Sequence, residues 1–285
     1  MQYANSCAYG NSQSGRSPSV EFLLLYDLHL FAQVEVAGQK RLANIDTGAN
    51  IDLAFGVFEG VEMLDGEEGP VHGAVGEVRL RSGRVPDVRL LDEQVGPLQV
   101  AISDENGYEK HPFPVSMRLG AKTLLSRPLL LDFKGLRMGR ERLPDSYPRV
   151  AAPLEFVCGV PFVEIELGGR RLRALFDTAA GMSVLNTAHL DDLGLRPEVL
   201  YETQATDSSG TTVTLPVGRT RGLQIGGLAL GDCEYLMLDL SAIEEIMGTR
   251  IDLGLGLNTL LASSTVWYLD PQAGRVQVTD VGLPA

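Results

Sequence analysis

The chain has 285 residues, of which 44% are hydrophobic and 21% charged, a composition typical of a soluble globular protein. Its formal net charge of −13 argues against nucleic acid and against an anionic membrane surface as partners, because phosphate groups are bound by clustered Lys and Arg. The 3 cysteines, Cys7, Cys158 and Cys233, are too few for a disulfide framework, and their spacing matches no known metal site. We therefore expect free thiols in a reducing compartment.

Residues 1–19 are rich in Ser, Asn, Gly and Gln, and we expect them to form a flexible tail. They lack the basic start followed by an apolar run that marks a secretory signal. No apolar stretch in the chain approaches the length of a membrane span. The sequence therefore predicts a cytoplasmic protein.

The first half of the chain alternates between short apolar runs and turn residues, which is typical of a β domain. Residues 31–36 and 40–45 are predicted to form a hairpin, and the glycine-rich residues 66–84 a second hairpin with a mobile tip. Further on, a β region is predicted at 85–102, one short helix at 119–126 and a hairpin at 129–138. The prolines of residues 140–153 predict a linker, which places the first lobe at 20–139.

The second half, 154–285, is expected to form a lobe of the same plan. Its predicted hairpins cover 160–176, 201–217 and 266–278, and the second of these has the tip Asp207-Ser208-Ser209-Gly210. Short helices are predicted at 187–194, which ends at a glycine, and at 239–247, where apolar residues follow helical spacing.

One short motif occurs in both halves. Ile45-Asp46-Thr47-Gly48-Ala49 places its Asp eight residues after Gly38, and Phe176-Asp177-Thr178-Ala179-Ala180 places its Asp eight residues after Gly169. Later in each half, residues 119–126 match residues 255–262. A lone Asp-Thr-Gly is a weak signal, but its repetition in matching contexts predicts two copies of one β unit, each with one carboxylate.

Two adjacent carboxylates are suited to hydrolysis of an amide bond. At a separation of about 3 Å they cannot both ionise, so they share one proton, a behaviour for which aspartic proteases are a standard example. One member can then act as a base while the other acts as an acid. So close an approach needs a tight turn with a small residue after the Thr, which Gly48 supplies and Ala179 supplies with one additional methyl group.

The order of features in each half resembles the retropepsin-like aspartic proteases, the family that also contains the two-lobed pepsins. The resemblance covers residues 31–138 and 160–278, and it implies an all-β fold of two β-barrel lobes related by pseudo-two-fold symmetry. It also implies a single-chain monomer whose catalytic residues are Asp46 and Asp177. Thr47 and Thr178 would hydrogen-bond across to the opposite lobe, with Gly48 and Ala179 supporting the dyad.

Members of this family close glycine-rich hairpins, called flaps, over an extended polypeptide substrate and thereby exclude water. The resemblance places the flaps at residues 69–76 and 206–211. The candidate flap residues in contact with substrate are His72, Gly73, Ser208, Ser209 and Gly210.

The predicted function is that of an aspartic endopeptidase, and an inactive peptide-binding module of the same fold is the alternative. The two differ in sequence only at Ala179, where the family more often has Gly. We expect no cofactor. The histidines His29, His111 and His189 have no acidic or Cys neighbours at metal-ligand spacing, so we also expect no metal site.

Overall fold

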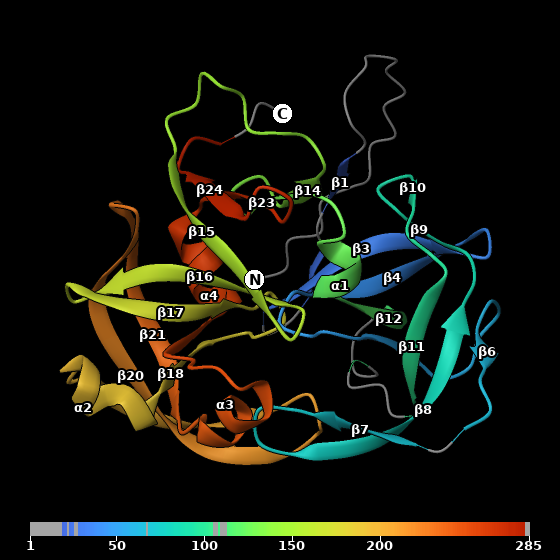
Figure 1. Cartoon of the computed structure of the whole chain (residues 1–285), viewed down its shortest axis with the longest axis horizontal. Helices are drawn as coiled ribbons and strands as arrows, with labels where there is room; N and C mark the ends of the chain where they lie inside the picture. Colours follow the sequence, from blue (N-terminus) through green and yellow to red (C-terminus); the bar gives the residue numbers. More distant parts are fainter. Residues whose placement is uncertain are drawn as a thin grey trace.

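The computed structural model describes residues 19–21, 23–25, 28–66, 68–104, 108 and 113–282. The predicted tail lies outside the described residues except for Ser19, and so does His111. Over the described residues the chain forms two large sheets with a few short helices, which confirms the predicted all-β, two-lobed fold. In Figure 1 the first half of the chain lies on the right and the second half on the left.

The first lobe is a sheet built from consecutive short strands and one helix. Its elements are β2 (Leu23–Leu25), β3 (His29–Val36), β4 (Gln39–Asp46), β5 (Asp52–Phe55), β6 (Glu62–Met63), β7 (Gly69–His72), β8 (Glu77–Val85), β9 (Val88–Leu90), β10 (Glu93–Gln94), β11 (Leu98–Ser103), β12 (Val115–Gly120) and α1 (Ala121–Leu124).

The second lobe has longer strands and more helical turns. Its elements are β16 (Val160–Leu167), β17 (Arg170–Phe176), β18 (Ser183–Asn186), η1 (Thr187–His189), α2 (Leu190–Leu193), β19 (Glu198–Thr206), β20 (Thr212–Ile225), β21 (Leu228–Leu238), α3 (Ser241–Met247), β22 (Leu253–Leu255) and α4 (Leu257–Ser263).

The two lobes contain the same run of paired strands. The first lobe has the order β3-β4-β12-β5-β11-β8, and the second has β16-β17-β22-β18-β21-β20. Strand directions agree as well: β4 is parallel to β12 and β17 to β22, while β5 is parallel to β11 and β18 to β21. The repeat inferred from the Asp-Thr motif is therefore a repeat of strand topology.

Six strands from both halves form the part of the larger sheet that joins the lobes. Their order is β1 (Ser19–Glu21), β14 (Arg137–Gly139), β13 (Leu129–Asp132), β23 (Val266–Asp270), β24 (Arg275–Thr279) and β15 (Val150–Val157). The pairing of β13 with β23 crosses from one half to the other. Strand β15 starts within the predicted linker 140–153 and pairs with β24 before it continues into the second lobe.

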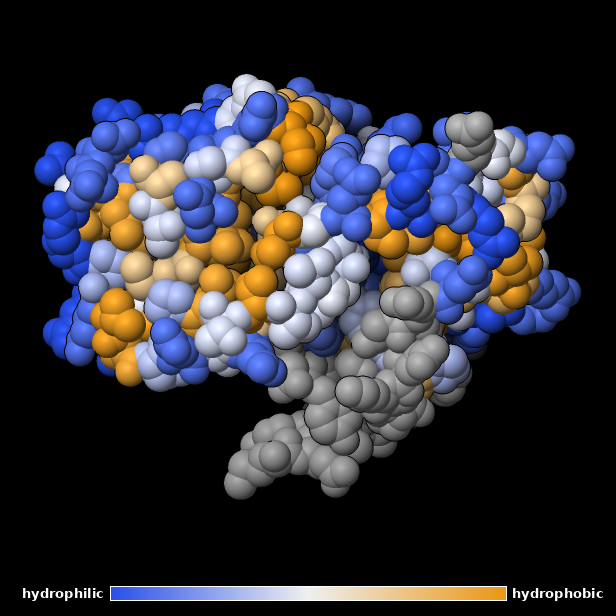
Figure 2. Space-filling model, turned by 90° about the horizontal axis from the view of Figure 1, so that it is seen from below, coloured by the Kyte–Doolittle hydropathy of each residue, from blue (hydrophilic) through white to orange (hydrophobic). Residues whose placement is uncertain are grey.

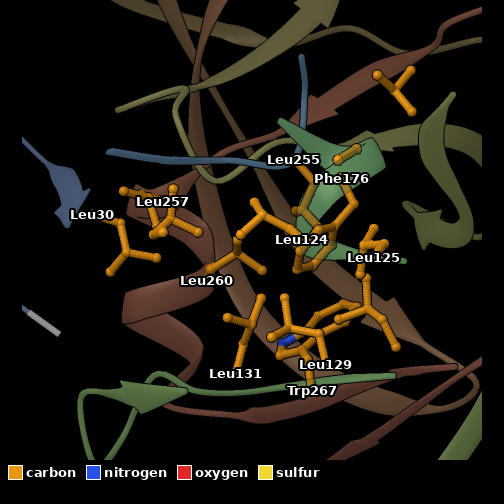
Figure 3. Packing of buried hydrophobic residues seen from close by; sticks show 14 of the residues in the cluster. Leu30, Leu124, Leu125, Leu129, Leu131, Phe176, Leu255, Leu257, Leu260 and Trp267 are labelled. Carbon is orange, nitrogen blue, oxygen red and sulfur yellow. The ribbon is translucent and has the colours of Figure 1, made fainter. Parts of the chain in front are cut away.

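One large hydrophobic core with residues from both halves runs through this junction. Leucines of the first half pack against aromatic and aliphatic side chains of the second half around the fully buried Trp267 (Figure 3). The residues labelled there are Leu30, Leu124, Leu125, Leu129, Leu131, Phe176, Leu255, Leu257, Leu260 and Trp267. Because burial of each large apolar side chain contributes about 1.5–3 kcal/mol, this shared core resists separation of the lobes.

The predicted helices are present but differ in extent. Residues Leu119 and Gly120 belong to β12, because they pair with Ile45 and Asp46 of β4, so α1 is shorter than the predicted 119–126. The predicted helix 187–194 is a 3-10 turn, capped by the Asn186 side chain, followed by α2. Among the described residues, no helix has the length and apolarity that crossing a membrane requires.

Candidate active site

Both Asp-Thr loops begin where a strand ends beside a parallel neighbour. Asp46 is the last residue of β4 and pairs with Gly120 of β12. Asp177 follows β17 directly, and its backbone N–H donates to the carbonyl oxygen of Leu255 in β22 at 3.1 Å. The repeated strand topology therefore brings the two carboxylates to equivalent places in the two lobes.

The two loops are hydrogen-bonded to each other through their threonines, both of which are fully buried. The Thr47 hydroxyl donates to the carbonyl oxygen of Phe176 at 2.7 Å, and the Thr178 hydroxyl donates to that of Ile45 at 2.6 Å. Each Oγ1 also accepts the backbone N–H of the opposite threonine, at 3.0 and 3.1 Å. These four bonds cross the boundary between the lobes and hold the loops in contact.

Gly48 allows the loops to approach closely. A Cβ atom at this position would lie 2.3 Å from Cγ of Asp177, a distance that no real side chain tolerates. The equivalent residue of the second loop is Ala179, whose backbone N–H donates to Oδ1 of Asp177 at 2.9 Å. The backbone N–H of Ala180 donates to the same oxygen at 3.1 Å. One oxygen of Asp177 is thus held by its own loop.

The environment of the two carboxyls raises the pKa of each. For Asp177 the pKa rises to about 7, first because burial disfavours the charged form and second because of the negative charge of Asp46. For Asp46, which is 5% exposed, burial likewise raises the pKa, but the positive charge of Arg118 and hydrogen bonds from the Ala49 and Gly48 backbone oppose the rise. Burial therefore favours the protonated form of both carboxyls, and the charge of Asp46 favours it further at Asp177.

Two further residues lie close to the dyad and were not predicted from the sequence. The Nε atom of Arg118 lies 3.3 Å from Oδ2 of Asp46, and both side chains are buried. The Tyr108 ring packs edge-on against Phe31 and Phe55, and the charges of Arg118, Asp46 and Asp177 all act on its pKa, which burial raises. Of these two residues, only Arg118 could have been noticed in the sequence, because it is a charged residue within the otherwise mostly apolar strand β12.

The tips of the two glycine-rich hairpins touch each other. Oδ2 of Asp207, at the tip between β19 and β20, accepts the backbone N–H groups of Val75 and Gly76 at 2.8 and 2.9 Å. Both of those residues belong to the tip between β7 and β8. Along the lower edge of Figure 1 the backbones of the two hairpins approach each other, near the labels β7 and α3. Seen from below, a group of pale residues of intermediate hydropathy lies near the middle of the molecule, beside hydrophobic ones (Figure 2).

The predicted flap residues have different surroundings. Gly73 is buried against the other tip, where an added Cβ would lie 2.2 Å from Oδ2 of Asp207. Ser209 donates through both its backbone N–H and its hydroxyl to Oδ1 of Asp207, and Gly210 has a φ of +84° in the same turn. Ser208 is exposed.

His72 contacts its own hairpin. Its Nδ1 lies 3.4 Å from Glu77 across the β7–β8 pair. Asp207, which connects the two tips, was not among the predicted site residues.

No group of three His, Cys, Asp or Glu side chains within the described ranges is arranged to hold a metal ion. A cavity of about 360 Å³ is lined by residues that include Lys122, Phe156 and Cys158, and neither Asp46 nor Asp177 is among its lining residues.

Comparison with known proteins gives a match over the part of the chain that contains the second Asp-Thr loop. Residues 163–259 match the family model described as aspartyl protease, and this segment contains Asp177, Thr178 and Ala179. A search of curated protein sequences found no match to the chain. The second half of the chain is therefore similar to aspartyl proteases, while Asp46 lies outside the matched segment.

Proposed function

We propose that the protein is an aspartic endopeptidase that hydrolyses peptide bonds of an extended polypeptide, with Asp46 and Asp177 as its catalytic residues. The observation that carries the proposal is the crossed hydrogen bonding of Thr47 and Thr178, which joins two Asp-bearing loops from different lobes. Ordinary turn aspartates would not need such a connection. One chain supplies both loops, so the working unit is a monomer whose lobes are related by a pseudo-two-fold rotation.

The reaction requires one ionised and one protonated carboxyl. The ionised member takes a proton from water as the water oxygen attacks the carbonyl carbon, and the protonated member gives its proton to the carbonyl oxygen. In the second step the C–N bond breaks, the leaving nitrogen receives a proton from the first member, and the second member regains its proton from a hydroxyl of the intermediate. The products are a carboxylic acid and an amine, and the dyad returns to its starting state.

The hairpin tips would cover the substrate. Because Asp207 joins them to each other and Asp46 is 5% exposed, we expect the tips to separate before a polypeptide chain reaches the dyad. Once bound, an extended substrate could pair its backbone with the hairpins as an additional strand. The tips would then exclude bulk water from the reacting bond.

The test is incubation of an unfolded protein and a long unstructured peptide with the chain between pH 4 and pH 8. We expect cleavage that a statine-type transition-state analogue inhibits. Asp46→Asn and Asp177→Asn should each abolish it, and the double variant should lose no more activity than either single one, because residues that act as a unit are not additive. Binding of the peptide without cleavage at any pH would instead favour the inactive peptide-binding module.

A further inference from the structure

We propose that Arg118 is a positioning residue that makes the dyad unequal, so that Asp46 is its ionised member and base, and Asp177 is its protonated member and acid. The inference rests on the proposed function for its consequence in catalysis. Its structural basis is the contact of 3.3 Å between Nε of Arg118 and Oδ2 of Asp46.

The location of Arg118 breaks the repeat between the lobes. Arg118 lies in β12 opposite Asn44 of β4, two residues before the Gly120 that pairs with Asp46. The matching strand of the second lobe, β22, has Gly254 at this place, opposite Leu175 of β17. Gly254 has no side chain that could carry charge toward Asp177. The cation therefore comes from one lobe only and acts first on the carboxyl of that lobe.

Burial strengthens the electrostatic effect of Arg118 on Asp46. The side chains of Arg118 and Asp46 are 10% and 7% exposed, so little water screens their charges. The Nε atom makes no hydrogen bond with a described residue, so the pair is held by charge rather than by an aligned donor and acceptor. A guanidinium next to a protonated Asp46 would be a buried cation facing a neutral group, which is strongly unfavourable. Arg118 therefore favours ionisation of Asp46 over ionisation of Asp177, against the opposing effect of burial.

The other carboxyl close to Arg118 is already engaged. Asp52 of β5 accepts the backbone N–H of Gly120 at 2.7 Å and the hydroxyl of Thr123 at 2.6 Å. The charges of Lys122 and Arg118 both act on it, but its hydrogen bonds hold it against α1. Asp52 therefore anchors the end of β12 and leaves Arg118 to Asp46.

The remaining titratable groups around the dyad agree with this assignment. The positive charge of Arg118 is the largest influence that lowers the pKa of Asp46, whereas it is the least of those acting on Asp177. The charge of Asp46 in turn raises the pKa of Asp177. Tyr108 faces all three charges, and its own pKa is raised by burial, so it stays neutral over the range in which the carboxyls titrate.

The first measurement compares pH–rate profiles of wild type, Arg118→Met and Arg118→Lys on one peptide substrate. Without the cation Asp46 holds its proton to higher pH, so we expect the acidic limb of kcat to move up by about one pH unit, a tenfold loss on that side. KM and the alkaline limb should change much less, and Arg118→Lys should restore part of the shift. Arg127→Met removes a surface arginine of the same lobe, which pairs with Glu93, and should leave the profile unchanged.

A uniform loss of kcat at every pH in Arg118→Met, without movement of the acidic limb, would overturn the proposal, because it would indicate a structural role only. The second measurement needs no catalysis. The carboxyl ¹³C shifts of Asp46 and Asp177, assigned from the Asp→Asn variants, are followed against pH in the wild type. We expect Asp46 to ionise at the lower pH; the reverse order would overturn the proposal even if Arg118→Met did not fold. Failure of the proposed function would appear separately, as a wild type that cleaves nothing.

Discussion

The Oγ1 atoms of Thr47 and Thr178 lie 3.3 Å apart, and each accepts the backbone N–H of the other residue while donating to a carbonyl oxygen of the opposite strand end. This arrangement is buried on all sides, since both threonines have no exposed surface. The stability of the contact between the lobes and the geometry of the candidate dyad therefore depend on the same two hydroxyl groups.

Replacement of either threonine by alanine should cost both stability and activity. Thr178→Ala leaves the carbonyl oxygen of Ile45 and the N–H of Thr47 buried without a partner, and each such group costs about 1–3 kcal/mol. We expect a loss of about 2–4 kcal/mol in the free energy of unfolding, measured in urea, together with a large fall in kcat. Thr178→Ser keeps the hydroxyl and should stay within about 1 kcal/mol of wild type. Equal losses for Ser and Ala would contradict the role of the hydroxyl.

The two small residues after the threonines should differ in their tolerance to change. Gly48→Ala would place Cβ 2.3 Å from Cγ of Asp177, so the loops must move apart. We expect its kcat to fall by a factor of about 100 or more, as misplacement of a reacting group by roughly 1 Å does elsewhere. Ala179→Gly only removes a methyl group, and we expect it to retain activity. A Gly48→Ala variant with wild-type kcat would show that the carboxyls do not need this approach.

The sequence was sufficient to predict the repeat, because the Asp-Thr motifs are preceded by hairpins of matching length. It did not indicate which side chains reach the dyad. The role of Arg118 depends on which face of β12 is turned toward β4, and Asp207 meets Val75 and Gly76 only after both lobes have folded. The sequence did not indicate strand β15 either. Its partner β24 lies far along the chain, and the prolines in β15 and before it favoured a linker.

The pKa of Asp177 predicts a dependence of stability on pH. Between about pH 4 and pH 7 the folded protein keeps a proton on Asp177 that the unfolded chain has released, so the folded state binds more protons and its stability falls as the pH rises. Asp177→Asn removes this term. The variant should gain stability over wild type at pH 8, on the order of 2 kcal/mol, and gain little at pH 4.

The matched variant Asp46→Asn should gain less stability at pH 8 than Asp177→Asn. Burial raises the pKa of Asp46 as well, but Arg118 opposes the rise, and the variant leaves this buried guanidinium without its carboxylate. Both effects are measured by thermal or urea unfolding at the two pH values. Equal stabilisation by the two variants would contradict an unequal dyad.

The carboxylate of Asp207 should control how readily the hairpin tips separate. Its Oδ1 organises its own turn by accepting from Ser209 and Thr211, while its Oδ2 accepts the N–H groups of Val75 and Gly76 from the other lobe. Burial alone would raise its pKa, but hydrogen bonds from the Ser209 hydroxyl and from the Gly76 and Val75 backbone outweigh this and lower it. The contact between the tips is therefore present at neutral pH and weakens as acid protonates Asp207.

Asp207→Asn separates the two functions of this side chain. An Asn can keep its oxygen in its own turn, but its NH₂ group then faces two N–H donors and cannot accept from them. We expect backbone amide exchange at Val75 and Gly76 to quicken by about tenfold or more, because each lost hydrogen bond is worth about 1 kcal/mol or somewhat more for a charged acceptor. The KM of a long peptide should rise, because closure of the hairpin tips over the bound substrate becomes less favourable. Ser208→Ala, at an exposed position of the same tip, is the control for the exchange measurement and should leave the exchange rates at Val75 and Gly76 unchanged. If the exchange rates of Asp207→Asn equal those of Ser208→Ala, Asp207 does not hold the tips together.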